Sequence, residues 1–135
     1  MESDVQTACL EYLRIRRIFH WRQNSGAFRT QSGRWFKCCS IKGVSDILGV
    51  LPDGRFLAVE CKSESGGRLS PEQKEFLSNI NANGGLGVVV HSVDELANAL
   101  ELAKENQVRR TRRQGVSYVC DREGCERMVP FRQQE

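Results

Sequence analysis

The feature that most constrains this chain is a pair of apolar segments joined by a strong turn. Pro52-Asp53-Gly54 separates residues 44–51 from residues 55–62, and its three residue types each favour tight turns. The two segments are therefore predicted to be strands of one antiparallel hairpin. If the turn is centred on its aspartate, residues whose numbers add up to 106 face one another, which places Asp46 opposite Glu60.

Three charged side chains project from this otherwise apolar hairpin. Asp46 and Glu60 are predicted to share one face, and Lys62 joins them because side chains in a strand alternate between faces. Facing carboxylates repel unless a proton or a cation intervenes, and a hard divalent cation takes oxygen ligands. The residues leave two interpretations open: a cation site with a lysine beside it, or a partly hydrated group of ion pairs at a strand end.

Helices and strands are predicted to alternate along the rest of the chain. The pattern Ser-x-x-Gln/Glu begins at Ser3, Ser70 and Ser92, and it predicts three helix starts because these side chains satisfy unpaired N–H groups. Further strands are expected over residues 35–39 and 86–91. Within the second of these, Leu86–Val90 is apolar throughout, as in a strand covered on both faces. The fold class is therefore α/β, a mixed sheet flanked by helices.

Length and charge suggest one core with a small appendage. The 135 residues suit a single domain, here residues 1–106, followed over residues 107–135 by a basic linker around Arg109–Arg113 and a small Cys-containing hairpin. Residues 1–42 hold eight Lys/Arg and three Asp/Glu, whereas residues 43–106 hold five and ten, a division that suits central cations and surrounding polyanions. No apolar run reaches membrane-spanning length, so no membrane partner is expected.

Two further patterns each have two interpretations. Cys120 and Cys125 could supply half of a structural zinc site, or they could be reduced thiols without a metal, since zinc needs four ligands. Basic residues also alternate with aromatic ones over residues 21–42. That stretch could form a groove for a nucleic-acid backbone or an ordinary pair of amphipathic strands.

The central motif resembles a known family. Gly43-Val-Ser-Asp46-Ile-Leu-Gly, followed by Pro52-Asp-Gly-Arg-Phe-Leu-Ala-Val-Glu60-Cys-Lys62, resembles the VRR-NUC domain of the PD-(D/E)XK nuclease superfamily. The resemblance covers residues 2–100 and includes Leu69-Ser-Pro-Glu-Gln73. One departure is Ser45, which stands where the superfamily's name has proline.

The resemblance implies a restriction-endonuclease-like fold and a set of site residues. Asp46, Glu60 and the backbone carbonyl of Cys61 would hold Mg²⁺ or Mn²⁺, and Lys62 would be catalytic. Glu2 and Gln73 would complete the rim. On the residues alone, Glu2 could instead be a solvated acid at a helix start, and Gln73 the capping partner of a serine. Expected DNA contacts are Arg22, Asn24, Ser25, Arg34 and Arg68.

The function implied is a Mg²⁺-dependent DNA endonuclease, structure-specific for Holliday junctions or other branched DNA. Similar stand-alone proteins are homodimers that act on four-way junctions, so the resemblance implies a homodimer here. Because those proteins come from phages and bacteria, the expected location is the cytoplasm of a bacterial or phage-infected cell. Three alternatives remain. The chain could be a non-catalytic nucleic-acid binding module, or a monomeric nuclease that acts on flaps or single strands. It could also be a structural or regulatory zinc protein in which the C-terminal cysteines matter most.

Overall fold

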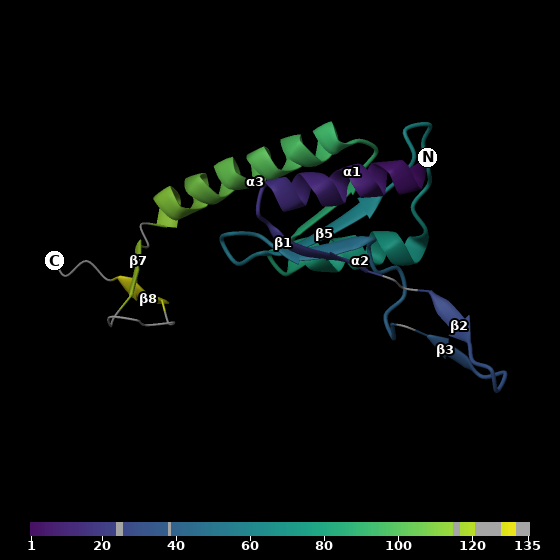
Figure 1. The fold of residues 1–135 in the computed structure, drawn as a ribbon. Helices are drawn as coiled ribbons and strands as arrows, with labels where there is room; N and C mark the ends of the chain where they lie inside the picture. The colour runs from purple at the N-terminus through teal and green to yellow at the C-terminus, as the bar shows by residue number, and fades with distance from the viewer. Residues whose placement is uncertain (24–25, 38, 115–116, 121–127, 132–135) are drawn as a thin grey trace. The chain divides into compact units, whose positions relative to one another are not determined.

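The computed structural model describes residues 1–23, 26–37, 39–114, 117–120 and 128–131, with side chains as far as residue 110. The chain divides into two compact units, residues 1–99 and 100–135. The elements are α1 (Glu2–Ile15), β1 (Phe19–Arg22), β2 (Ala27–Arg29), β3 (Trp35–Lys37), β4 (Ile47–Val50), β5 (Phe56–Cys61), α2 (Pro71–Ala82), β6 (Leu86–Val90), α3 (Val93–Gln114), β7 (Ser117–Cys120) and β8 (Met128–Phe131) (Figure 1).

The main sheet has four strands in the order β1-β4-β5-β6. Its first three strands are antiparallel neighbours, whereas β5 and β6 are parallel, which confirms the predicted mixed sheet. The register of β4 and β5 also agrees with the prediction. Ile47 pairs with Val59 and Val50 pairs with Phe56, so paired numbers add up to 106.

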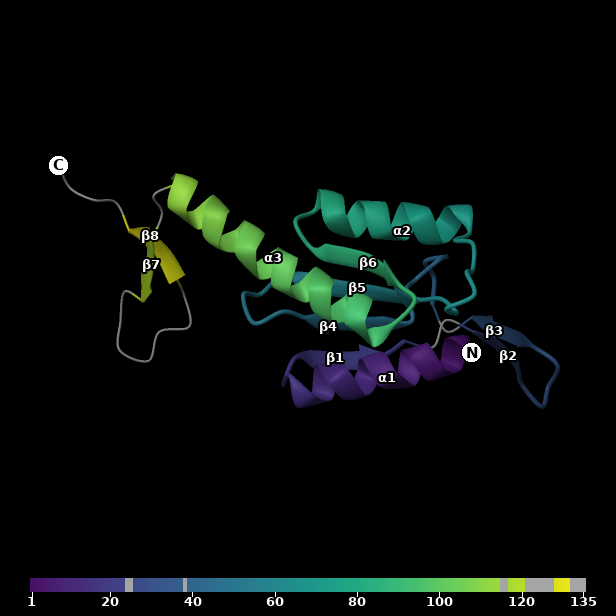
Figure 2. The ribbon, with the colours of Figure 1, turned by 90° about the horizontal axis from the view of Figure 1, so that it is seen from above.

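Helices cover both faces of this sheet. Figures 1 and 2 show α1 and the first turns of α3 on one face and α2 on the other. The two faces of β5 pack against opposite layers, since Ala58 packs in a cluster with Leu77 of α2 whereas Cys61 contacts Cys9 of α1. Both cysteines are fully buried in the core.

Strand β1 was not predicted. The helix before it ends without a glycine, because Arg17 itself adopts the left-handed conformation (φ 55°) and Ile18 N–H donates to the Leu13 carbonyl at 3.0 Å. The strand is short and lies at the edge of the sheet, with three of its four residues exposed. It therefore lacks the apolar alternation that signals a half-buried strand.

Two boundaries differ from the prediction. Residues 44–46 precede β4 instead of belonging to it. The first helix begins at Glu2 with Met1 as its cap, two residues before the predicted Ser3 cap, and the Met1 amino group donates to the Asp4 carboxylate at 2.8 Å. Burial of β6 is also lower than its apolar sequence suggests, because the strand lies at the edge of the sheet and only Val90 is fully buried.

A separate two-stranded sheet, β2 and β3, extends from the main sheet beyond the N-terminal end of α1 in both views (Figures 1 and 2). It contains the predicted strand over residues 35–39, which is observed over Trp35–Lys37. Of the two interpretations of residues 21–42, the strand pair is therefore present. The aromatic side chains of this hairpin are exposed instead of packed.

The C-terminal part begins inside α3. This helix continues to Gln114, so the predicted basic linker around Arg109–Arg113 is helical, as its many good helix formers and lack of Gly or Pro allow. Strands β7 and β8 pair antiparallel from Ser117↔Phe131 to Cys120↔Met128, which confirms the predicted hairpin. Within the described residues, no helix is both long and apolar enough to cross a membrane.

Candidate active site

Glu60 of β5 and Lys62, the first residue after that strand, are buried together. Glu60 is 1% exposed and Lys62 is 7% exposed, and their Oε1 and Nζ atoms lie 3.0 Å apart. The alternation of the strand brings both to one face, as predicted. Removing two charges from water costs several kcal/mol per ion, about what a good ion pair with further hydrogen bonds can offset.

Those further hydrogen bonds come from Gln73 in the first turn of α2. Its Nε2 donates to Glu60 Oε1, and its Oε1 accepts from Lys62 Nζ at 3.3 Å and from Ser70 N–H at 2.9 Å. Ser70 Oγ in turn accepts from Gln73 N–H at 3.1 Å. Gln73 is therefore the capping partner of Ser70, and the same amide also contacts both members of the buried pair.

Two hydrogen bonds hold Asp46 at the end of the sheet where Glu60 lies. Its Oδ2 accepts the backbone N–H of Cys61 at 2.9 Å, and its carbonyl oxygen accepts the backbone N–H of Gln23 at 2.8 Å. Continuing the observed register by one residue places Asp46 opposite Glu60, as the sequence predicted. The side chain is half-buried, so it can meet both the protein and a ligand.

One carboxylate oxygen of Glu60 lacks a hydrogen-bond partner among the described residues. This oxygen, Oε2, is buried. Burial raises the pKa of the Glu60 carboxyl above its ordinary value. The hydrogen bond from Lys62 opposes this rise, and the negative charges of Asp46 and Glu2 add to it. Glu60 Oε2 is therefore open to a further hydrogen-bond donor or to a cation.

Gly43 brings the segment before Asp46 against α2. Its φ is +72°, and a Cβ built at this position would collide with the backbone of Glu72 and Gln73. Only glycine satisfies both conditions. The sequence signal was present, since this glycine opens the motif, but its steric role follows only from the fold.

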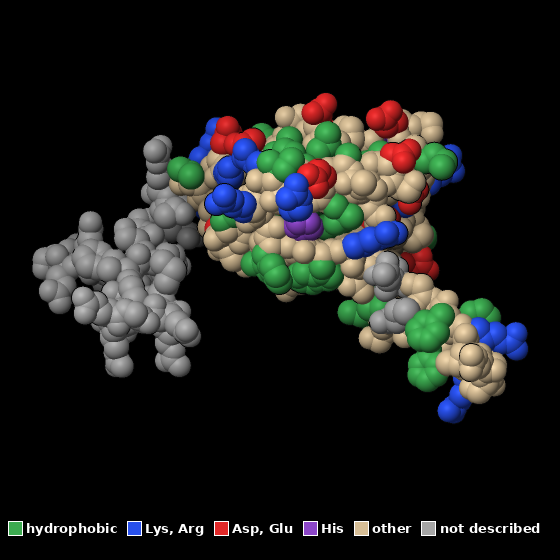
Figure 3. Space-filling view, in the orientation of Figure 1, with side chains coloured by type: hydrophobic (Ala, Val, Ile, Leu, Met, Phe, Trp, Pro, Cys, Tyr) green, Lys and Arg blue, Asp and Glu red, His purple; other side chains and the backbone are tan. Residues whose placement is uncertain are grey.

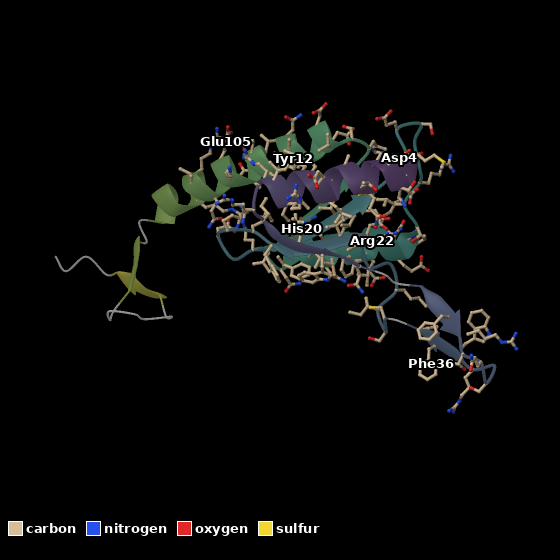
Figure 4. The ribbon with its side chains drawn as sticks, in the orientation of Figure 1. Asp4, Tyr12, His20, Arg22, Phe36 and Glu105 are labelled. Atoms are coloured by element: carbon tan, nitrogen blue, oxygen red, sulfur yellow. The ribbon has the colours of Figure 1, made fainter. Side chains whose placement is uncertain are left out.

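The other predicted site residues are more dispersed. Glu2 lies exposed in the first turn of α1, within electrostatic range of Glu60. Arg22 at the end of β1 (Figure 4), Arg34 and Arg68 are exposed. Asn24, Ser25 and Cys125 lie outside the described residues, as does the side chain of Cys120, so the zinc site stays a prediction. Among described residues, no three His, Cys, Asp or Glu side chains gather as a metal site.

The fold and the site together define a mixed α/β domain in which β5 carries Glu60, Lys62 follows two residues later, and Asp46 lies just before the neighbouring strand β4. The profile of the VRR-NUC domain matches residues 4–94, and the chain belongs to this family, a nuclease-type family. The match includes Asp46, Glu60, Lys62 and Gln73 but not Glu2. No curated protein matches the chain.

Proposed function

We propose that this protein is a metal-dependent endonuclease that hydrolyses phosphodiester bonds in DNA. The observation that carries the proposal is the buried Glu60 Oε2, which has no partner in the described chain and lies in a site with Lys62, Gln73 and Asp46. A site built only for stability would satisfy this oxygen internally. An incoming cation satisfies it instead.

The donor set fits a hard divalent cation. Two carboxylates and a backbone carbonyl, from Asp46, Glu60 and Cys61, offer the oxygen ligands that Mg²⁺ or Mn²⁺ prefers. Such a cation, when bound, supplies Lewis-acid stabilisation of negative charge on a phosphodiester. Two carboxylate side chains suffice for this set, which agrees with the absence of a three-residue cluster in the described chain.

Lys62 supplies a positive charge that is already oriented. Its ammonium is fixed by Glu60 Oε1 at 3.0 Å and by Gln73 Oε1 at 3.3 Å, and it has three N–H donors. The proposed role of Lys62 is to donate a hydrogen bond to a phosphate oxygen as negative charge grows, or to orient the attacking water. Gln73 is a positioning residue, because it contacts both Glu60 and Lys62.

We infer further that the substrate is branched DNA, cut by a homodimer. The support is a charge pattern and an apolar surface. Residues 12–45 contain eight Lys/Arg and no Asp or Glu, as suits a polyanionic partner. Phe19 and Trp21 on β1 and Phe56 on β5 are exposed, and their register through β4 places them on the face that α2 covers only in part. A second copy would bury this surface.

The test is cleavage of linear duplex, flapped and four-way-junction DNA with Mg²⁺, with Mn²⁺ and with EDTA. We expect metal-dependent cutting that Glu60→Gln and Asp46→Asn abolish and that Glu75→Gln, an exposed carboxylate of α2, leaves unchanged. Failure of the wild type to cut any of these DNAs, or full activity of Glu60→Gln, contradicts the proposed nuclease. Sedimentation as a monomer contradicts the dimer alone.

A further inference from the structure

The β2–β3 hairpin exposes large aromatic side chains to solvent. Phe28 is 55%, Trp35 70% and Phe36 51% exposed. Figure 3 shows hydrophobic and basic side chains next to one another on this hairpin, and Figure 4 shows Phe36 pointing away from the main sheet. A two-stranded ribbon is barely stable in water by itself, and exposed apolar groups on it bring no core packing. This arrangement suits recognition of a partner.

The hairpin is nevertheless closed by its own turn. Thr30 N–H donates to the Arg34 carbonyl at 2.9 Å, and Arg34 N–H donates to Thr30 Oγ1 at 3.1 Å. Gly33 adopts φ +81° and donates its N–H to the Thr30 carbonyl at 2.9 Å. These bonds order the strand ends before any partner binds, which lowers the entropy lost on binding.

The register divides the hairpin into two different faces. Phe28 pairs with Phe36 on one face, where the two rings stack with centroids 6.0 Å apart and planes within 17°. On the other face Arg29 pairs with Trp35, next to Lys37. The second face thus combines an open indole with two cations, the pairing that binds a base by stacking and a backbone phosphate by charge.

Both ends of the hairpin are attached at the candidate active site. On one side, Gln23 N–H donates to the carbonyl of Asp46 at 2.8 Å. On the other side, the chain returns to Gly43, whose close approach to Glu72 and Gln73 fixes it against α2. A nucleic acid that touches the hairpin therefore lies near the proposed cleavage site.

Charge favours a nucleic acid over a second copy of this chain. No acidic residue occurs between Glu11 and Asp46, whereas Arg29, Arg34 and Lys37 belong to the hairpin itself. Two such hairpins would repel one another, while a phosphate backbone would attract each of them. Stacking on an indole also needs a base whose face is open, which a continuous duplex does not offer.

We propose that the β2–β3 hairpin is a stacking platform for unpaired bases beside the cleavage site, with Trp35 as its main contact. This inference rests on the proposed nuclease function and adds a reason for substrate choice. DNA with unpaired bases at a branch gains a stacking contact that a continuous duplex lacks. The preference for branched DNA then lies in the hairpin and the chemistry lies in the buried site.

The experiment measures binding without cleavage, in EDTA, with 2-aminopurine at an unpaired position of a branched DNA. We expect wild-type protein to quench its fluorescence by stacking. Trp35→Ala should weaken binding of this DNA about 10-fold or more, whereas linear duplex binding changes little. Trp35→Phe should restore most of the affinity, because a π-face is retained. Ile15→Ala, which removes an exposed apolar side chain elsewhere, should have no effect.

Other outcomes contradict the inference. If Trp35→Ala weakens branched and linear DNA equally, or leaves the quenching unchanged, the hairpin is not a stacking platform. If the Trp35→Ala and Phe28→Ala/Phe36→Ala variants convert a dimer to monomers without altering the quenching, the hairpin contacts a second copy instead. The nuclease proposal fails separately, when wild-type protein with Mg²⁺ or Mn²⁺ cuts nothing although base stacking is observed.

Discussion

The candidate active site and the β2–β3 hairpin obtain their order in opposite ways. Glu60 is almost completely buried in β5. Gln73 in the first turn of α2 donates to it, and Asp46 accepts a hydrogen bond from the next residue of the strand, Cys61. Trp35 is mostly exposed, and its strand is held by hydrogen bonds within its own turn. The first region depends on the whole fold, whereas the second depends on a few neighbouring residues.

This contrast suggests a division of work. A buried, water-poor site strengthens the electrostatic contacts that phosphodiester hydrolysis needs. An exposed ribbon offers aromatic faces and cations to a large partner without disturbing the core. Substitutions in the two regions should therefore have separable effects on rate and on binding preference.

Among substitutions that keep the proposed metal ligands, the largest expected effect is the loss of cleavage in Lys62→Ala. We expect a decrease of about 100-fold or more in turnover at saturating Mg²⁺, because a positioned positive charge is removed from the phosphate site. Base stacking in EDTA should remain, whereas Trp35→Ala should show the reverse pattern. Single-turnover rates and 2-aminopurine quenching measure the two properties in the same protein preparation.

Lys74→Ala is the matched control for Lys62→Ala. Lys74 lies in the same helix as Gln73, but it is exposed. Its removal should leave turnover within about 2-fold, the scale of an exposed charge in salt. If both variants lose activity equally, general charge and not the position of Lys62 explains the effect, and the contrast between the two regions disappears.

The next largest expected effect is on the free energy of unfolding. It concerns Gly43, which lies between the β2–β3 hairpin and the segment that carries Asp46. Gly43→Ala should destabilise the fold by more than the roughly 1–2 kcal/mol that the left-handed conformation costs an alanine, because its Cβ also collides with α2. Gly54→Ala isolates the conformational part, since Gly54 has φ +88° but no atom within 4 Å of an added Cβ. Urea unfolding of both variants measures the difference.

Equal losses of free energy of unfolding in Gly43→Ala and Gly54→Ala would show that the approach of Gly43 to α2 is not tight. A larger loss in Gly43→Ala should also lower cleavage, because this glycine fixes the segment that carries Asp46. Gly54→Ala should keep wild-type cleavage at a temperature where it is folded.

Much of the site could be predicted because its chemistry is local. The turn at Asp53 determines the register, and strand alternation then brings Glu60 and Lys62 to one face. Strand β1 could not be predicted, because Arg17 ends the preceding helix in a conformation usually taken by glycine. The sequence offered two roles for Gln73 but not its simultaneous contacts with Ser70, Glu60 and Lys62, since these depend on how α2 packs against β5, a tertiary contact that local propensity does not determine.

A smaller effect separates the two roles of Gln73. Ser70→Ala removes the side chain that accepts Gln73 N–H, and it should cost about 1 kcal/mol in free energy of unfolding. Gln73→Ala loses the other half of the cap and also the contacts to Glu60 and Lys62. We expect cleavage to fall markedly only in Gln73→Ala. Unfolding and cleavage are compared in the same buffer, and equal activity in both variants would limit Gln73 to capping.

The smallest expected effect is a pH dependence of stability that the buried site has and the hairpin lacks. Burial raises the pKa of Glu60 in the folded state, so the folded protein holds this proton more tightly than the unfolded chain does. Its contribution to the free energy of unfolding is therefore fully present below the ordinary Glu pKa and is lost as pH rises through the raised value. Urea unfolding in EDTA across this window should show a steeper decline with pH for wild type and Trp35→Ala than for Glu60→Gln. Parallel profiles for wild type and Glu60→Gln would mean that another group titrates there.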